Sequence, residues 1–276
     1  MIDTIPFDAP DAPARFARTL RQTGFAVLSR HPLQAAGLKR FYAAWAAFFA
    51  GPEKDAWRFD PAGQTGWFPY RTENARDSRQ KDLKEFFHVY RHAPVPAGPE
   101  VDTRRVHAGL IALGETLLDW LDRETPADIA GRLSMPLREM VRGSDRHLLR
   151  ILHYPPLPEA VEAGAVRAAA HEDINLITLL LTGSEPGLQA RDRDGGWHDV
   201  PCDAGLVTVN AGDMLSRATG GYFPSTTHRV MNPVDAANRS RYSMPLFMHA
   251  RAEVPIAPGI TADDYLQERL REIGLA

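Results

Sequence analysis

Two histidines and one aspartate are the residues whose types and spacing point most directly to chemistry. His171 and Asp173 lie two positions apart, and in an extended segment this spacing turns both side chains to the same face. One imidazole nitrogen and one carboxylate oxygen can then bind the same cation. His228 lies 55 positions after Asp173, at the start of another predicted strand, and can supply a third ligand.

Two imidazoles and one carboxylate leave part of a metal's coordination sphere open, which is the arrangement of non-haem iron(II) centres that react with oxygen. A structural zinc site instead uses four protein ligands, often cysteines. Cys202 is the only cysteine of the chain, so neither a thiolate cluster nor an internal disulfide is expected. An H-x-D triplet alone carries little weight in a chain with 10 histidines, and the iron prediction therefore depends on His228.

Arg241 and Ser243 form a second group, because they share one face of the strand predicted over residues 241–249. A guanidinium beside a hydroxyl can bind a carboxylate through two hydrogen bonds. The mostly apolar residues 244–248 predict that this strand is buried. A buried arginine needs an anionic partner, and the carboxylate of a ligand would supply it.

Both groups belong to an ordered series of motifs that resembles the isopenicillin N synthase-like family of 2-oxoglutarate/Fe(II)-dependent oxygenases. The resemblance is strongest over residues 148–250. The segment DLKEFFH at 82–88 resembles the N-terminal part of the same enzymes, so the similarity covers nearly the whole chain. The other motifs are LRILHYPP at 149–156, HED at 171–173, GLQA at 187–190, DVP at 199–201, NAGDML at 210–215, STTHRV at 225–230 and RYS at 241–243.

The resemblance implies a metal site and a co-substrate site. The two histidines and the aspartate would bind Fe(II), and Arg241, Ser243 and the hydroxyl of Tyr154 would bind the distal carboxylate of 2-oxoglutarate. O2 would be the other co-substrate, with succinate and CO2 as products. The reaction would be hydroxylation, desaturation or cyclisation at an unactivated C–H bond of a small molecule. No catalytic residue is expected beyond the metal ligands, and the turn at 210–213 would support the sheet.

Six residues are candidates for contact with the substrate. Two lie in a polar loop predicted over residues 60–81, where such enzymes often place substrate contacts. Three are phenylalanines that can line a pocket. The sixth follows the His-x-Asp pair, where the chain departs from the family's usual sequence. The candidates are Arg71, Asn74, Phe86, Asn175, Phe223 and Phe247.

The elements that must position these residues change character along the chain. The first part reads as helices with few strands, whereas after residue 148 short apolar runs alternate with Gly-, Pro- and Asp-rich turns. Asp194-Gly195-Gly196 is a hairpin signal. Helices are predicted over 10–23, 32–49, 102–124 and 261–273, a proline-rich linker over 93–99, and strands over 25–28, 83–90, 148–154, 174–181, 188–191, 197–200, 206–209, 228–231 and 241–249.

This pattern predicts a mainly β fold with surrounding helices, built on a double-stranded β-helix (jelly roll). Three parts are expected: an N-terminal mixed region at 1–125, the jelly-roll domain at 146–250, and a C-terminal helix within 251–276. Because the linker at 93–99 is short, the two halves are expected to share one core.

Bulk composition excludes several classes of partner. The chain has 276 residues, of which 44% are hydrophobic and 24% charged, as in ordinary globular proteins. A net charge of −3 offers no strong field to hold nucleic acid or an anionic membrane. The sequence contains no run of about 18 apolar residues, so it predicts no membrane-spanning helix. A small-molecule substrate and a cytoplasmic location are expected, and a monomer is expected with an oligomer left open.

Two other functions stay open on the sequence. An oxidase that does not use 2-oxoglutarate, such as isopenicillin N synthase, has the same metal ligands and holds its substrate's own carboxylate with the Arg-x-Ser pair. Arg241 and Ser243 therefore do not separate these two functions. A non-catalytic jelly-roll binding protein is less favoured, because binding alone does not require three metal ligands beside an anion-binding arginine.

Overall fold

The larger of two main β-sheets forms the centre of the molecule. The computed structural model describes residues 2–60, 64–73, 80–181, 184–233 and 238–272. The strands of this sheet are β1 (Thr4–Pro6), β2 (Phe25–Ser29), β3 (Gly66–Phe68), β4 (Glu85–Val89), β5 (Leu148–Tyr154), β7 (Ile177–Leu181), β10 (Val207–Ala211) and β12 (Arg241–Met248). Their order is β1-β2-β10-β7-β12-β5-β4-β3, and only the β1–β2 pair is parallel. The sheet therefore takes strands from both halves of the chain.

The smaller sheet has four antiparallel strands. These are β6 (Ala168–His171), β8 (Leu188–Arg191), β9 (Trp197–Asp199) and β11 (His228–Val230), in the order β6-β11-β8-β9. The predicted hairpin turn joins β8 to β9, and Gly195 supplies its positive φ of 88°. The two sheets form the predicted double-stranded β-helix, while β13 (Pro255–Ala257) and β14 (Ile260–Thr261) pair separately.

Side chains of the larger sheet alternate between two apolar clusters. Along β5, Leu149 and Ile151 belong to the cluster that also contains the buried residues of the helices. Leu152 and Tyr154 belong to a second cluster, which includes Leu188 of the smaller sheet. The inner face of the larger sheet thus faces the smaller sheet, and its outer face carries the helices.

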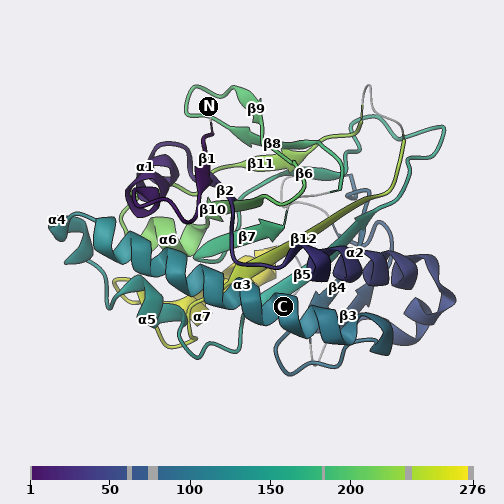
Figure 1. Cartoon of the computed structure of the whole chain (residues 1–276), viewed down its shortest axis with the longest axis horizontal. Helices are drawn as coiled ribbons and strands as arrows, with labels where there is room; N and C mark the ends of the chain where they lie inside the picture. The colour runs from purple at the N-terminus through teal and green to yellow at the C-terminus, as the bar shows by residue number, and fades with distance from the viewer. Residues whose placement is uncertain (1, 61–63, 74–79, 182–183, 234–237, 273–276) are drawn as a thin grey trace.

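Helices α2 and α3 run along the lower part of the view in Figure 1, and the smaller sheet lies at the top. The long α3 packs against α1, α2 and α5. Trp45 of α2 donates its indole N–H to Thr103 of α3 at 2.9 Å. The helices are α1 (Ala12–Thr23), α2 (Ala35–Ala50), α3 (Ala97–Glu124), α4 (Ala127–Ala130), α5 (Leu137–Val141), α6 (Asp213–Ala218) and α7 (Ala262–Glu272), with a 3-10 helix over Pro52–Trp57.

Several element boundaries differ from the predicted ones. Helix α3 begins at Ala97, inside the predicted linker, because Pro96 and Pro99 fall at its N-cap and first turn, where a missing N–H breaks no helical bond. Strand β7 begins at Ile177, three residues later than predicted. Strand β3 lies in the predicted loop at 60–81 and pairs with β4.

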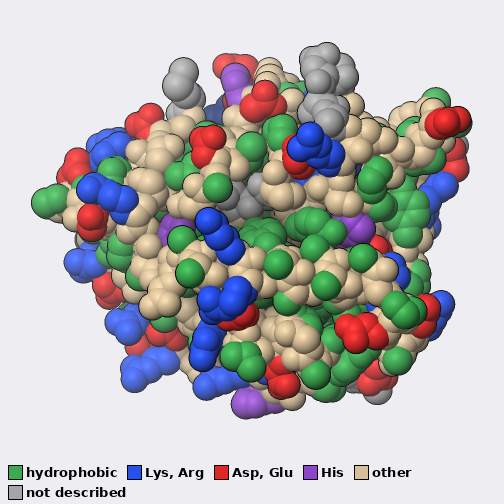
Figure 2. All heavy atoms as spheres, turned by 45° about the vertical axis from the view of Figure 1, so that its right-hand side comes forward, with side chains coloured by type: hydrophobic (Ala, Val, Ile, Leu, Met, Phe, Trp, Pro, Cys, Tyr) green, Lys and Arg blue, Asp and Glu red, His purple; other side chains and the backbone are tan. Residues whose placement is uncertain are grey.

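Charged side chains of both signs are interspersed over the face shown in Figure 2. No helix in the described part of the chain is long and apolar enough to cross a membrane.

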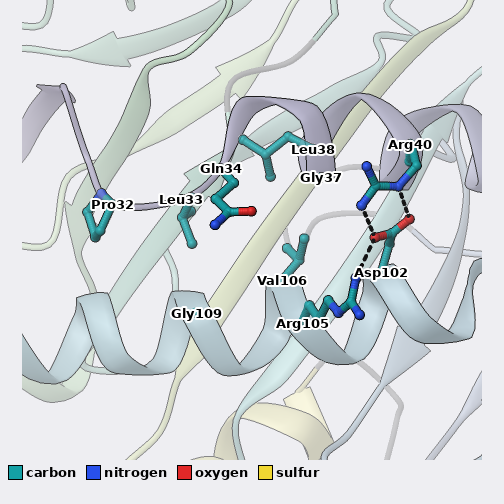
Figure 3. Close-up of a pocket in the computed structure, with 10 residues that line it drawn as sticks. All are labelled: Pro32, Leu33, Gln34, Gly37, Leu38, Arg40, Asp102, Arg105, Val106 and Gly109. Carbon is teal, nitrogen blue, oxygen red and sulfur yellow. Dashed lines mark hydrogen bonds and ion pairs between the residues drawn. The ribbon is translucent and has the colours of Figure 1, made fainter.

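Figure 3 shows a hollow of about 390 Å³ between α2 and α3, on the helical side of the larger sheet. Inside it, Asp102 accepts hydrogen bonds from Arg40 at 2.9 and 3.1 Å and has Arg105 at 4.0 Å, so this carboxylate is already neutralised.

Candidate metal centre

The structure brings His171, Asp173 and His228, here called the metal triad, to one end of the smaller sheet. His171 ends β6 and His228 begins β11, and the two residues are direct partners across these strands. Oδ1 of Asp173 lies 3.9 Å from Nε2 of His171 and 3.7 Å from Nε2 of His228. One ligand atom from each residue lies within 4.8 Å of the others. One cation can therefore contact all three.

The second nitrogen of each ring fixes the tautomer of the two histidines. Nδ1 of His171 lies 2.8 Å from the carbonyl oxygen of Ala169, and Nδ1 of His228 lies 3.0 Å from that of Thr226. A carbonyl oxygen only accepts, so both Nδ1 atoms carry the proton. Each Nε2 then keeps its lone pair for a metal, as in protein sites where a second hydrogen bond orients the ligating imidazole.

Asp173 is held in the same way through its other oxygen. Thr178 donates its hydroxyl to Oδ2 at 2.5 Å, and Asn210 donates its side-chain amide to the same atom at 2.8 Å. Oδ1, the atom nearest to both histidines, is thereby left for a metal. Thr178 was not predicted from the sequence as a residue that supports Asp173. The feature that could have indicated it is a hydroxyl side chain inside an otherwise apolar strand.

The protonation states of His171 and Asp173 suit a divalent cation. Burial of the His171 ring, and then the neighbouring imidazole of His228, lower the pKa of His171 to about 4. Burial alone raises the pKa of Asp173, but the two imidazoles and the hydrogen bonds from Asn210 and Thr178 outweigh it, so the pKa is lowered overall. At neutral pH the carboxylate is charged and His171 is neutral, as metal ligation requires.

The turn between β10 and α6 supports the backbone around Asp173. The N–H of Asp213 donates to the carbonyl of Asp173 at 2.7 Å, and the N–H of Gly212 donates to Leu176 at 2.9 Å. A Cβ atom on Gly212 would lie 2.2 Å from the carbonyl oxygen of Asn175, so this close approach requires glycine. These contacts explain why β7 begins only after this turn.

The N-terminal part of the chain supports His228. Gly24 ends α1 with a φ of 72°, and a Cβ there would lie 2.1 Å from Oγ1 of Thr226. Thr226 donates this hydroxyl to the carbonyl of Thr23 at 2.9 Å. The ring of Phe25 meets the imidazole of His228 edge to face, with centroids 5.6 Å apart. The position of His228 thus depends on residues some 200 positions earlier.

Arg241 is almost completely buried, with an exposure of 1%. Its Cα pairs with that of Tyr154 across β12 and β5, and its guanidinium lies 5.1 Å from the centre of the Tyr154 ring. Nε donates to the carbonyl of Glu185 at 2.9 Å, whereas the buried Nη1 has no hydrogen-bond partner among the described residues. Ser243 is also buried, two positions along the same strand. An unsatisfied N–H on a buried cation indicates a place for an anion.

The DLKEFFH segment is joined to the strand that carries His171. Oδ1 of Asp82 accepts the N–H of Ala169 at 3.0 Å, and the carbonyl of Ala169 accepts Nδ1–H of His171. Lys84 is buried between Asp82 at 2.8 Å and Glu73 at 2.9 Å. Burial alone lowers the pKa of Lys84, but these two carboxylates raise it overall, so the amine stays charged.

Glu85 of the same segment points to the other side of the sheet, into a buried network. Its Oε1 lies 2.7 Å from Nδ1 of His153, whose Nε2 lies 3.0 Å from Oγ of Ser240. Its Oε2 accepts from Trp67 at 2.9 Å and from Lys54 at 3.1 Å. Because His153 belongs to β5 and Ser240 precedes β12, this network ties together the strands that carry Tyr154 and Arg241.

Two of the six substrate candidates, Phe86 and Phe247, lie beside Arg150. Phe86 stacks on Phe68 with ring centroids 4.3 Å apart. The guanidinium of Arg150 lies 4.6 Å from the ring centre of Phe86 and 5.7 Å from that of Phe247. Arg150 is itself oriented by His88, whose Nε2 accepts from its Nε at 2.9 Å.

The other four candidates lie elsewhere. Arg71 forms an exposed ion pair with Glu162 at 2.6 Å. Asn74 falls outside the described residues. Asn175 is fully buried and donates its amide to the carbonyl of Ile177, so it supports the turn before β7. Phe223 packs in the helix-side core.

Comparison with known proteins agrees with this geometry. The family model of the 2OG-Fe(II) oxygenase superfamily matches residues 146–250, and that of the non-haem dioxygenase in morphine synthesis N-terminal region matches residues 2–108. A Shewanella oneidensis protein described as an oxygenase is 44% identical, with a TM-score of 0.90 over 100% of this chain and 99% of its own. The chain belongs to the 2OG-Fe(II) oxygenase superfamily.

Two further relatives of this oxygenase span most of both chains. A 2OG-Fe(II) oxygenase family protein from Caulobacter crescentus is 31% identical, with a TM-score of 0.80 over 99% of each chain. A 2-oxoglutarate-dependent dioxygenase from Monascus ruber is 29% identical over 86% of this chain and 78% of its own. The prediction of an Fe(II)- and 2-oxoglutarate-dependent oxygenase is confirmed.

The residues of this oxygenase fit both the iron(II) and the 2-oxoglutarate that its family uses. The triad offers two imidazole nitrogens and a carboxylate oxygen, the donor set expected for iron(II) with open positions. The unsatisfied Nη1 of Arg241 fits a carboxylate such as the distal one of 2-oxoglutarate. Bound iron and 2-oxoglutarate together supply the activation of O2, which no protein side chain provides.

Proposed function

We propose that the metal triad holds the Fe(II) of this oxygenase and that Arg241, Ser243 and Tyr154 hold the distal carboxylate of 2-oxoglutarate. The observation that carries the proposal is the triad itself. Its three ligand atoms lie within 4.8 Å of one another, and the remaining polar atom of each ligand is engaged by a hydrogen bond. In addition, the buried guanidinium of Arg241 keeps an N–H without a partner in the described part of the chain.

The reaction proposed is oxidation of an unactivated C–H bond of a small molecule, by hydroxylation, desaturation or cyclisation. In it the protein orients the groups and excludes water, while the hydrogen bonds to Nδ1 and Oδ2 keep the ligand atoms directed at one point. Arg241 orients the co-substrate from the strand next to Tyr154. The carboxylate of Asp173 balances one of the metal's two charges.

The substrate proposed to fit this site has an apolar body and a polar group. Phe86 and Phe247 offer aromatic faces, and Arg150 lies beside both rings with its Nη1 paired to Glu73 at 3.1 Å. A ligand that packs on the rings and accepts a hydrogen bond from Arg150 would satisfy both features. The monomeric state and the cytoplasmic location stay predictions.

The test is turnover of 2-oxoglutarate in the presence of Fe(II) and O2. Succinate would be measured with and without a panel of small aromatic and heterocyclic compounds, and a substrate should stimulate its formation. The mass of the product then names the reaction: hydroxylation adds one oxygen, whereas desaturation or cyclisation removes two hydrogens. Substrate-dependent O2 consumption without succinate would contradict the proposal, and so would triad variants that all keep wild-type Fe(II) binding.

A further inference from the structure

A second arginine lies buried close to the proposed co-substrate site. Arg167 immediately precedes β6, four positions before His171, and is 1% exposed. It and Arg241 are the two charged residues among the largest fully buried side chains of the described chain. A buried guanidinium is costly unless its charge and its N–H groups find partners. None of the functions assigned above uses Arg167.

The hydrogen bonds of Arg167 are incomplete. Nη2 donates to the carbonyl of Arg239 at 2.8 Å, but the buried Nε has no partner among the described residues. Arg241 is in the same condition, with Nε bonded to a carbonyl and Nη1 without a partner. In the described ranges, no carboxylate lies within 4.0 Å of either guanidinium. Each of the two buried guanidiniums thus keeps an N–H without a partner, and no carboxylate of the described residues lies within ion-pair distance.

Several observations indicate that the two guanidiniums lie near each other. The carbonyl that binds Arg167 is that of Arg239, two residues before Arg241. Ala168, next to Arg167, lies in the same apolar cluster as Tyr154, on which Arg241 is stacked. Burial, and then the positive charge of Arg241, lower the pKa of Arg167, which agrees with two like charges close together. Like charges held together in a buried site favour an anion between them.

We infer that Arg167 is a second binding group for the distal carboxylate of 2-oxoglutarate, acting together with Arg241. This inference rests on the proposed function of the Arg241 site. A carboxylate has two oxygens and accepts several hydrogen bonds, so it can satisfy Nε of Arg167 and Nη1 of Arg241 at once. Two cations facing one carboxylate make the site selective for oxo acids with a distal negative charge.

The test compares two ligands that differ only in that carboxylate. Binding of 2-oxoglutarate and of 2-oxopentanoate, which has the same chain length without the distal carboxylate, is measured by calorimetry on Mn(II)-loaded protein, which does not turn over. Arg167→Met should weaken 2-oxoglutarate binding at least about tenfold and leave 2-oxopentanoate within about twofold. Arg167→Lys keeps the positive charge but loses the two-pronged guanidinium, so its affinity for 2-oxoglutarate should lie between those of wild type and Arg167→Met. Arg193→Met, an exposed arginine in the β8–β9 turn, is the matched control.

The outcomes separate this inference from the function on which it rests. If wild-type protein binds Mn(II) but does not prefer 2-oxoglutarate to 2-oxopentanoate, the proposed co-substrate site itself fails. If wild type has that preference and both Arg167 variants keep it, only the inference is overturned. Equal losses for both oxo acids would make Arg167 a structural residue and would also overturn it. Should Arg167→Met not fold, the Arg167→Lys comparison decides alone.

Discussion

The side-chain amide of Asn210 donates a hydrogen bond of 2.8 Å to Oδ2 of Asp173. This contact keeps the other oxygen, Oδ1, directed at the two histidines. We expect Asn210→Ala to weaken Mn(II) or Fe(II) binding about 10- to 100-fold without unfolding the protein, because supporting hydrogen bonds of this kind orient metal ligands. Anaerobic calorimetry would measure it. Thr208→Val, two positions earlier in β10, is the control, since its hydroxyl has no partner among the described residues.

Removing the charge of the ligand carboxylate should have a larger effect. Asp173→Asn keeps the shape of the side chain but neutralises the triad, so metal affinity should fall more than about 100-fold. Glu172→Gln changes the same charge one residue away, where the carboxylate accepts the hydroxyl of Thr227 at 2.8 Å. Manganese electron paramagnetic resonance, which separates bound from free Mn(II), would compare the two. Similar losses in both variants would mean that overall charge, rather than ligation by Asp173, controls binding.

Glu85 should contribute chiefly to stability. Burial alone raises its pKa, but hydrogen bonds from His153 and Lys54 outweigh this, so the pKa is lowered and the carboxylate is charged. Glu85→Gln leaves partners of a buried charge unsatisfied, and we expect a loss of about 3 kcal/mol in the free energy of unfolding. Urea denaturation would measure the change against Glu53→Gln, an exposed glutamate in the 3-10 helix. A difference below about 0.5 kcal/mol between the variants would contradict the expectation.

Three buried histidines should make the protein sensitive to mild acid. Burial lowers the pKa of His107 and His147 to about 4 and that of His249 to about 3. Unfolded histidine has a pKa near 6.5, so the unfolded chain binds more protons below that pH. The stabilisation from neutral imidazoles is therefore complete above about pH 6.5 and is lost as the pH falls towards 4. A shift of this size corresponds to about 3 kcal/mol for one group.

Urea denaturation between about pH 7.5 and 5 would check this, because in that range most carboxylates stay ionised. His147→Gln should flatten the dependence of unfolding free energy on pH, while the same change at the exposed His92 should not. Parallel pH profiles for wild type and His147→Gln would rule out a contribution from this histidine.

The sequence was sufficient to predict the three residues that the structure brings together as the metal triad, and insufficient for those that orient them. The spacing of His171 and Asp173 places them locally, and the ordered motifs add His228. Asp82 binds the backbone of Ala169 across 87 positions, and Asn210 reaches Asp173 across 37. Such contacts depend on how distant strands are brought together, which local pattern does not encode.

The same limit applies to the fold. Strands β5 and β8 have the bounds that their apolar patterns predict, because β5 is a mostly buried run and β8 alternates between buried and more exposed residues. The start of α3 at Ala97 was not predicted, because the prolines near it indicate a linker. The first turn of a helix nevertheless tolerates proline. The order of strands in the larger sheet was not predicted, since pairing between distant segments leaves no local mark.

Because β12 lies in the middle of the larger sheet, this sheet cannot be completed until β12 has been synthesised. β12 pairs with both β5 and β7, although it is the last strand of the sheet to leave the ribosome. Until residue 248 emerges, two central strands expose unpaired edges that can associate with other chains. Arg241 arrives on the same strand that closes those edges. A nascent chain therefore completes its sheet and its proposed anion site together, and we expect a product truncated before β12 to be both inactive and prone to aggregation.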